Sequence, residues 1–224
     1  MTSLDFSSVS SSFSVLRQGM EITALITLTA VVVGIILGTL LALFRLSPIK
    51  PLAWAATVYV NLFRSVPLVM VILWFFLIVP QLMRALFGSA VQDIRFASAL
   101  VAFSLFEAAY YAEIIRAGII SVPQGQFTAG LAMGFTRSQT IRLIILPQAL
   151  RNMVPLLLTQ AVILFQDTSL VYVIGLSDFF GTAHKVGDRD GRLVEMLLFA
   201  GVVYFIISFS FSQLVARYHK RSGR

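Results

Sequence analysis

Long uncharged stretches dominate the pattern of hydrophobic and polar positions along the chain. Between Glu21 and Arg45 lie 23 consecutive residues without a charge, and a helix of about 20 apolar residues crosses the hydrocarbon core of a bilayer. Stretches of similar length and character recur four more times. We therefore predict an all-α integral membrane protein with five transmembrane helices. The predicted spans cover residues of about 22–44, 65–83, 96–115, 153–174 and 196–216.

Polar side chains set the third and fourth spans apart from the others. An ionisable group inside a span costs about 2.5 to 3.5 kcal/mol on insertion scales, so such groups are expected to face protein or a water-filled path. This makes them the leading candidates for a translocation route. The candidate residues of a substrate path are Glu107, Glu113, Gln160, Gln166, Asp167, Thr168 and Ser169.

The three acids of these spans allow different roles. Glu107 and Glu113 are six residues apart, hence roughly 120° apart around a helix, and are not expected to line one narrow path together. Glu113 could instead form a local ion pair with Arg116, three residues on. Asp167 could hold the α-ammonium group of a substrate, with amide or hydroxyl donors holding its carboxylate, or it could cap or brace a broken helix. The residues alone leave these alternatives open.

Basic residues predict the orientation of the chain, because cytoplasmic connections accumulate Lys and Arg. With the N-terminus outside, eleven bases lie inside and six outside. The inside set is Arg45, Lys50, Arg64, Arg116, Arg137, Arg142, Arg151, Arg217, Lys220, Arg221 and Arg224. We predict an N-out/C-in topology. Residues 1–21 then form a periplasmic segment without the pattern of a cleaved signal, 117–152 a long cytoplasmic loop, and 217–224 a basic cytoplasmic tail.

Composition excludes several classes of protein. The chain is 58% hydrophobic and 12% charged, with a mean hydropathy of +0.90, whereas soluble domains carry about 25% charged residues. The net charge of +7 fits cytoplasmic loops better than a nucleic-acid surface, and no nucleic-acid partner is expected. Because the chain has no Cys and its two His residues, His184 and His219, are far apart, no metal site or disulfide is expected.

Small residues recur in two places. In the first span Ala30, Gly34, Gly38 and Ala42 stand four residues apart, a spacing that lets two helix backbones approach closely in a membrane. This stripe could pack against a second subunit or against another helix of the same chain. In the long loop, residues 124–133 predict a short helix with small groups, and Gly134 can supply the positive φ of its C-cap.

The same loop carries a motif. Thr128, Ala129, Gly130 and Gly134 are followed after nine residues by Ile144, and then by Leu146 and Pro147. This spacing resembles the E-A-A-x3-G-x9-I-x-L-P loop of the permease subunits of ABC importers, which docks in a groove of the ATPase. The chain departs from the pattern at Thr128, where the family often has Glu, and at Gly130, where it has Ala. The resemblance implies that the seven residues named here couple the chain to an ATPase; the alternative is an amphipathic surface helix only.

Four further segments are similar to signatures of the polar-amino-acid permeases: Glu107–Gly118, Pro123–Gln126, Ile145–Arg151 and Gln166–Leu170. The last of these, Gln166–Leu170, most resembles the glutamate/aspartate importers. The resemblance implies a type I ABC importer permease fold in the bacterial inner membrane. It also implies three partners: a second permease subunit, identical or different; two ATPase copies; and a periplasmic amino-acid-binding protein. Local electrostatics do not select an acidic substrate, since three intramembrane acids favour a cationic one.

No G-x-x-x-x-G-K-[ST] phosphate loop occurs in the chain, so ATP and Mg²⁺ are expected to bind a partner ATPase and not this subunit. The chain itself is therefore expected not to be an enzyme. Two alternatives remain. An ion-gradient-driven secondary transporter would use the buried acids as proton or sodium sites. A membrane-embedded enzyme would need a second cluster of catalytic groups near those acids.

Overall fold

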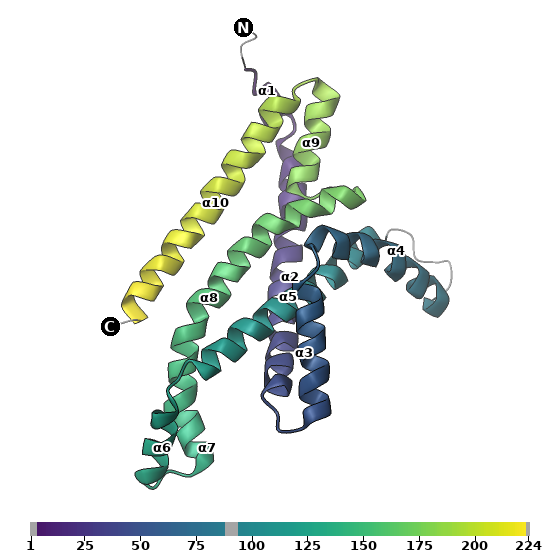
Figure 1. The fold of residues 1–224 in the computed structure, drawn as a ribbon. Coiled ribbons are helices and arrows are strands. Elements are labelled where there is room, and N and C mark those ends of the chain that lie inside the picture. Colours follow the sequence, from purple (N-terminus) through teal and green to yellow (C-terminus); the bar gives the residue numbers. More distant parts are fainter. Residues whose placement is uncertain (1–3, 88–93, 223–224) are drawn as a thin grey trace.

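The protein is an all-helical bundle in a computed structural model that describes residues 4–87 and 94–222 (Figure 1). No strand occurs among these residues. The helices are α1 (Ser7–Ser11), α2 (Phe13–Arg45), α3 (Lys50–Arg64), α4 (Leu68–Phe87), α5 (Arg95–Ile120), α6 (Gln124–Ala132), α7 (Arg137–Thr140), the π-helix η2 (Ile141–Ile145), α8 (Leu146–Asp167), the 3₁₀ helix η3 (Thr168–Ile174), α9 (Phe179–Asp190) and α10 (Leu193–Ser222).

Five of these segments are long and apolar enough to cross a membrane, as predicted. They are α2, α4, α5, the segment from α7 through η3, and α10. The helices differ from the sequence prediction mainly at their ends. Helix α2 begins nine residues before the predicted span, and α4 continues through Pro80 to Phe87.

Helices α3 and α9 were not predicted, because neither is long enough to span a bilayer. Pro51 stands in the first turn of α3, where its missing N–H is not needed. Asp178 caps the N-terminus of α9 by accepting hydrogen bonds from the backbone N–H groups of Phe180 and Gly181, at 3.2 and 2.8 Å.

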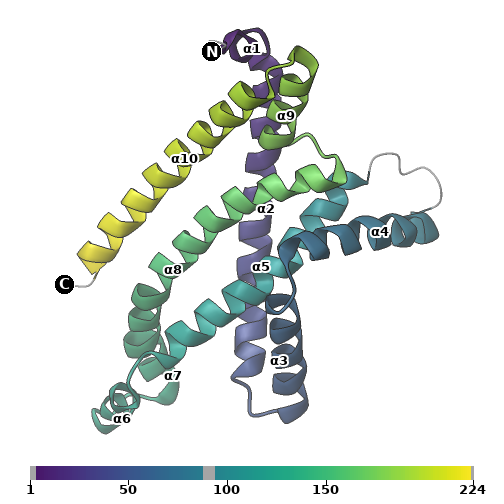
Figure 2. The same ribbon diagram turned by 45° about the horizontal axis from the view of Figure 1, so that its top comes forward.

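Helix α2 forms the long axis of the molecule, and α5 crosses it diagonally (Figures 1 and 2). Helix α3 lies beside one end of α2, while α4 runs off to the side. The C-terminal half of α10 stands apart from α8 in both views. Helices α6 and α7 lie together at one end of the molecule, and we call α6, α7 and η2 the tip.

The crossing of α2 and α5 is the most extensive contact between two of the described helices, and it shows what the small-residue stripe packs against. A Cβ atom on Gly38 would lie 2.8 Å from the Tyr111 Cβ and 2.9 Å from the Ala112 backbone nitrogen. One on Gly34 would lie 3.0 Å from the Tyr111 ring. The stripe therefore packs against α5 of the same chain.

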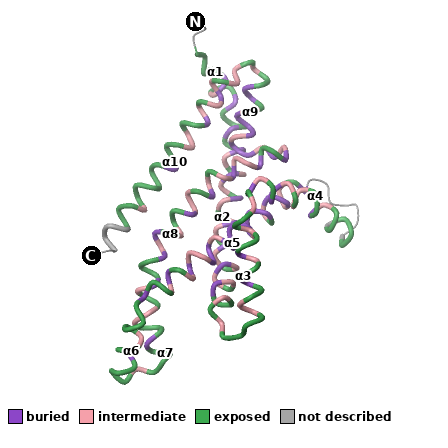
Figure 3. Tube along the Cα trace, viewed as in Figure 1, coloured by how far each residue is buried: buried purple, intermediate pink, exposed green. Residues whose placement is uncertain are grey.

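Helix α5 is the centre of the fold (Figure 3). In its most apolar 18-residue window 67% of the residues are buried, against at most 28% in the other four spans. Helix α3 packs on it through Val60, which contacts Ala109 and Ala112, and the Tyr59 hydroxyl donates to the Leu105 carbonyl at 2.8 Å. The most buried helix is thus the one that carries Glu107 and Glu113.

Phe179 and Asp178 tie the start of α9 to α2 and α10, respectively. The Phe179 N–H donates to the Thr23 hydroxyl at 3.1 Å, and the Tyr204 hydroxyl donates to the Asp178 carboxylate at 3.3 Å. Burial raises the pKa of Asp178 from its ordinary value near 3.8 to about 6, against the lowering effect of its hydrogen bonds.

Replacing Gly38 by Ala should destabilise the protein, because the new methyl group meets backbone and Cβ atoms of α5. Overpacking of this kind costs typically about 1 to 3 kcal/mol. The matched control is Gly201→Ala, since a Cβ at Gly201 meets nothing within 4 Å. We expect a lower thermal unfolding midpoint for the Gly38 variant in detergent and an unchanged or slightly higher one for the control. Equal midpoints would contradict the packing.

Asp178→Asn should change how stability depends on pH. Because the folded-state pKa is raised, the contribution of Asp178 is fully present below about pH 4 and is lost as the pH rises through about 6. The loss is on the order of 3 kcal/mol for a shift of this size. Thermal unfolding from pH 4 to 7 should show the wild type losing stability relative to the variant. Parallel curves for the two proteins would disprove the shift.

Candidate substrate path and coupling site

Glu107 lies at the crossing of α2, α5 and α8 and is fully buried. The side-chain amide of Gln160, on α8, donates to both of its carboxylate oxygens at 3.2 Å. The Cβ of Glu107 also lies against Gly34 of α2. The structure thus brings two predicted residues of the substrate path together, in a position that is closed on all sides.

Asp167 is the last residue of α8, where the α-helix tightens into η3. The hydroxyls of Thr168 and Ser169 donate back to the carbonyls of Phe165 and Gln166, at 2.7 and 2.8 Å. The half-buried Asp167 side chain makes no cap hydrogen bond. A half-buried carboxylate where the α-helix changes to a 3₁₀ helix is well placed to accept hydrogen bonds from a ligand.

Asp167 and Gln160 belong to one polar region, because they stand seven residues apart and hence near the same face of α8. Gln166 is exposed, Ser169 is partly buried and Thr168 is fully buried. Five of the seven predicted path residues therefore lie along the C-terminal half of α8 and the start of η3, and Glu107 of α5 contacts one of them, Gln160.

Glu113 lies apart from this region, in an ion-pair cluster. The predicted pair with Arg116 is present, at 2.5 Å, and Arg45 of α2 binds the same carboxylate. Arg64 of α3 approaches it to 3.8 Å. We call Arg45, Arg64, Glu113 and Arg116 the Glu113 cluster. Its contacts join α2, α3 and α5, which argues for a structural role and not for a place in the substrate path.

The tip consists of short helices with well-defined ends. Helix α6 covers nine residues of the predicted 124–133 helix, and Gly134 follows it with a φ of 87°. Thr136 and Gln139 form a reciprocal capping box at the start of α7. Both the short helix and the positive φ of Gly134 were predicted, and both are confirmed.

Gly130 explains one departure from the family motif. It is buried against α7 and η2, and a Cβ there would lie 2.6 Å from the Thr140 Cγ2 and 3.0 Å from the Ile144 Cδ1. Thr128 and Ala129 lie on the exposed side of α6, as do Leu131 and the 77% exposed Met133. One face of α6 therefore packs on η2, and the opposite face is open to a partner.

The last residues of the motif connect the tip to the fourth span. Ile144 lies in η2, and Leu146 and Pro147 begin α8, which continues η2 without a break in the helix. Leu146 and Pro147 are exposed, while Ile144 is partly buried. A displacement of α6 can thus pass through η2 into α8.

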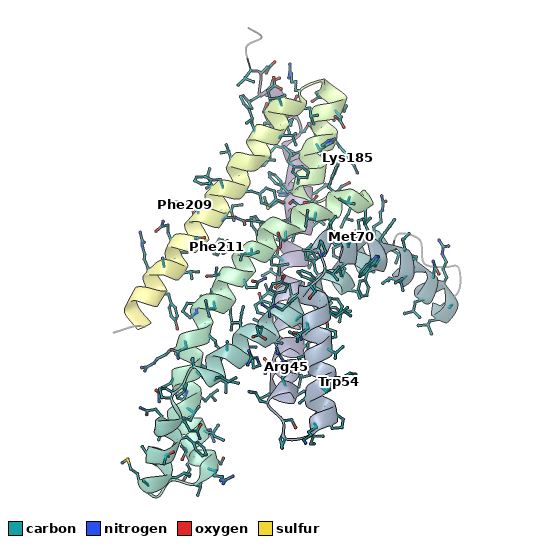
Figure 4. The ribbon with its side chains drawn as sticks, viewed as in Figure 1. Arg45, Trp54, Met70, Lys185, Phe209 and Phe211 are labelled. Atoms are coloured by element: carbon teal, nitrogen blue, oxygen red, sulfur yellow. The ribbon has the colours of Figure 1, made fainter. Side chains whose placement is uncertain are left out.

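An apolar groove of about 420 Å³ lies between α2, α8 and α10. Phe211 of α10, which is labelled in Figure 4, is one of the residues that line the groove. The polar side chains among the lining residues are those of Thr27 and Ser208. The groove offers no charged group to an amino acid and is a poor candidate for a substrate site.

Comparison with known proteins decides the family. Residues 30–224 match the family model of the binding-protein-dependent transport system inner membrane component. The chain belongs to this family of permeases.

Relatives of the permease share most of its length. It is 59% identical over 224 residues to the glutamate/aspartate import permease protein GltK of Escherichia coli O6:H1, covering 100% of both chains. It is 34% identical over 204 residues to the arginine transport system permease protein ArtQ of Bacillus subtilis, covering 91% of this chain and 90% of that one.

The fold of the permease also has a solved counterpart. A crystal structure of an amino acid ABC transporter with histidines matches it with a TM-score of 0.86 at 30% identity, covering 99% of this chain and 100% of that chain. The permease has the type I fold of ABC importers. Inward-facing conformations of the MetNI methionine ABC transporter share the fold at 19% identity and a TM-score of 0.70, covering 92% of this chain and 97% of that chain.

Sequence reasoning missed three parts of the permease site. Arg45 and Arg64 stand 68 and 49 positions before Glu113 in the sequence, so spacing along the chain could not predict that they contact it. Tyr111, which fills the space beside Gly34 and Gly38, carries no charge or motif that marks it. In the part of the chain that the structure describes, no three His, Cys, Asp or Glu residues gather in a way that could hold a metal ion.

Proposed function

We propose that this permease is the membrane subunit of an ATP-driven importer of the acidic amino acids glutamate and aspartate. The observation that carries the substrate class is the full-length similarity to the glutamate/aspartate import permease of E. coli. The junction of α8 and η3, with the half-buried carboxylate of Asp167, is the feature of the fold that suits an amino-acid substrate.

The proposed setting is the bacterial inner membrane, with the N-terminus outside and the tip in the cytoplasm. A second permease subunit, identical or different, completes the translocation path. Two copies of a separate ATPase bind ATP and Mg²⁺, and a periplasmic protein delivers the amino acid. The tip supports this orientation, because Arg137 and Arg142 lie on it and basic residues accumulate on the cytoplasmic side.

In the proposed site Asp167 accepts the α-ammonium group of the substrate. Gln166, Thr168 and Ser169 are the neighbouring groups for its carboxylates, through amide and hydroxyl donors. Glu107 is fully buried beside Gln160 and α2, and it does not touch the substrate. The acids of the chain do not themselves favour an acidic substrate, so discrimination between amino acids rests largely on the delivering protein.

The proposed coupling runs from the ATPase through the exposed face of α6. Closure of the ATPase pair displaces the tip, and the packing of Gly130 on Thr140 and Ile144 transmits the movement to η2 and α8. Helix α8 is held to α5 where a Cβ on Gly118 would lie 2.7 Å from the Met153 Cβ. The three helices α2, α5 and α8 therefore rock together between inward-open and outward-open states.

Ala129→Asp should abolish ATP-driven uptake while membrane insertion stays intact. The substitution puts a charge on the exposed face of α6 and leaves the Gly130 face unchanged. The matched control is Ala129→Ser, which adds a small neutral group. Co-purification of the ATPase with each variant, followed by uptake in vesicles, measures the effect. Normal uptake by the Asp variant would count heavily against α6 as the docking helix.

Proteoliposomes containing the permease and its proposed partners should take up glutamate and aspartate only when ATP is present on the side of the membrane that carries the tip and the ATPase. Asp167→Asn should weaken this uptake by about ten- to a hundredfold in kcat/KM, the loss expected for a hydrogen bond to a charged group. Glu21→Gln is the control, since Glu21 is exposed and pairs with the exposed Arg17 one turn earlier on α2.

Two results would overturn the proposal. Uptake that survives without ATP but collapses with the proton gradient would favour a secondary transporter. Uptake of arginine in preference to glutamate, with the same delivering protein, would overturn the substrate class. Unchanged kcat/KM in the Asp167 variant would remove that residue from the path without affecting the rest.

A further inference from the structure

One exposed side of α8 carries polar side chains at regular intervals. Asn152, Thr159 and Gln166 are all exposed and stand seven residues apart, which places them within about 40° of one another around the helix. Leu156 and Ile163, with 51% and 42% exposure, lie between them on the same side. We call these five residues the α8 polar face. The face is about 21 Å long, which is most of the thickness of a hydrocarbon core.

The pattern of this face is not the one expected of a helix surface covered by lipid. Every exposed residue of α2 between positions 22 and 44 is apolar, as a lipid surround requires. An amide or hydroxyl group is costly in hydrocarbon, which offers it no hydrogen bond. Gln166 lies well inside the span of about 153–174 and cannot avoid this cost at a lipid surface. The α8 polar face therefore needs water or another protein surface in front of it.

A second groove, of about 460 Å³, lies along the half of this face that is nearer to the tip. Asn152, Leu156 and Thr159 of α8 are among the residues that line it. Ser212 lines it from α10, whose C-terminal half stands apart from α8 (Figures 1 and 2). Two helices therefore present polar groups to this groove, in contrast to the apolar groove between α2, α8 and α10.

The polar groups of the face keep part of their hydrogen-bonding capacity. The Asn152 amide donates to the Ser121 hydroxyl at 2.8 Å, and the Thr159 hydroxyl donates to the Pro155 carbonyl at 2.9 Å. The side-chain oxygens of Asn152 and Thr159 can still accept, and the Asn152 amide has a second N–H to donate. Neutral groups of this kind bind an ammonium or a carboxylate only weakly, which suits a passage that a solute must also leave.

We infer that the α8 polar face lines the inner part of the substrate path, which leads from the proposed site at Asp167 to the side of the membrane that carries the tip. The inference rests on the proposed function and adds Asn152 and Thr159 to the residues of the path. Continuity with the proposed site favours a path over a helix contact, because Gln166 belongs to both. A helix of the second permease packed tightly on this face would close the polar route out of the site.

The reaction of single cysteines with a charged thiol reagent tests the inference, because the chain has no cysteine of its own. The assembled transporter in lipid nanodiscs is treated with sulfonatoethyl methanethiosulfonate without ATP, and the mass of this chain is followed. Thr159→Cys should react at least about tenfold faster than Ile206→Cys, since a thiol in apolar surroundings does not form the reactive thiolate. Ile206 is the matched control, because it is 55% exposed on α10 and lines neither groove.

Uptake by the modified variants separates a path from a recess that is merely filled with water. Modified Thr159→Cys should lose most of the uptake that the same variant shows before treatment, because the added group fills the path. Treatment of Ile206→Cys should leave its uptake as it was before treatment. Ile163→Cys, on the same face and nearer to Asp167, should behave like Thr159→Cys and serves should that variant fail to assemble.

The inference is overturned if Thr159→Cys and Ile163→Cys both react as slowly as Ile206→Cys, which would place lipid or a partner helix on the face. It is equally overturned if both react quickly and uptake continues after the modification. Neither result depends on which amino acid is carried. A transporter that is labelled and blocked as described but carries arginine would refute the proposed substrate and leave the path in place.

Discussion

The fold depends on the close approach of α2 and α5. In a membrane, water does not drive helices together, and association relies on packing and hydrogen bonds. Gly34 and Gly38 let the α2 backbone touch Tyr111 and Ala112 directly, and α3, α4, α8 and α9 pack on the pair so formed. Helix α3 packs on Ala109, and α8 is held through the contact of Gly118 with Met153.

Polar groups of the spans fall into two kinds around this unit. Glu113 and Glu107 are held in defined contacts, by arginines in one case and by Gln160 in the other. Asp167 has a different position, at the junction of α8 and η3, where its side chain makes no cap hydrogen bond. Because a charge inside a membrane is retained at a cost, the first two are accounted for by the architecture, whereas Asp167 calls for a function.

The pattern of hydrophobic residues was enough to predict the five spans, and the small residues of the long loop with Gly134 were enough to predict the short helix of the tip, because both depend on local sequence. Span length follows from the thickness of a bilayer, and the end of α6 follows from the freedom of Gly134 to take a positive φ. What could not be predicted depends on contacts between distant segments. The partner of the stripe, the convergence of Arg45 and Arg64 on Glu113, and the pairing of Glu107 with Gln160 are set by how α5 crosses its neighbours. Helices α3 and α9 were missed because they are too short to show a span.

The central claim is that α2, α5 and α8 move as one rigid body when the ATPase closes. The absence of cysteine in the chain makes paired spin labels at introduced cysteines specific. Leu25 of α2 and Ile120 of α5 are both exposed and lie on opposite sides of the crossing. In the assembled transporter the distance between labels at these sites should stay the same with and without ATP, while the distance from Ile120 to a label on the second permease subunit should change. A change of the Leu25–Ile120 distance on ATP binding would show that the crossing opens, and the account would be wrong.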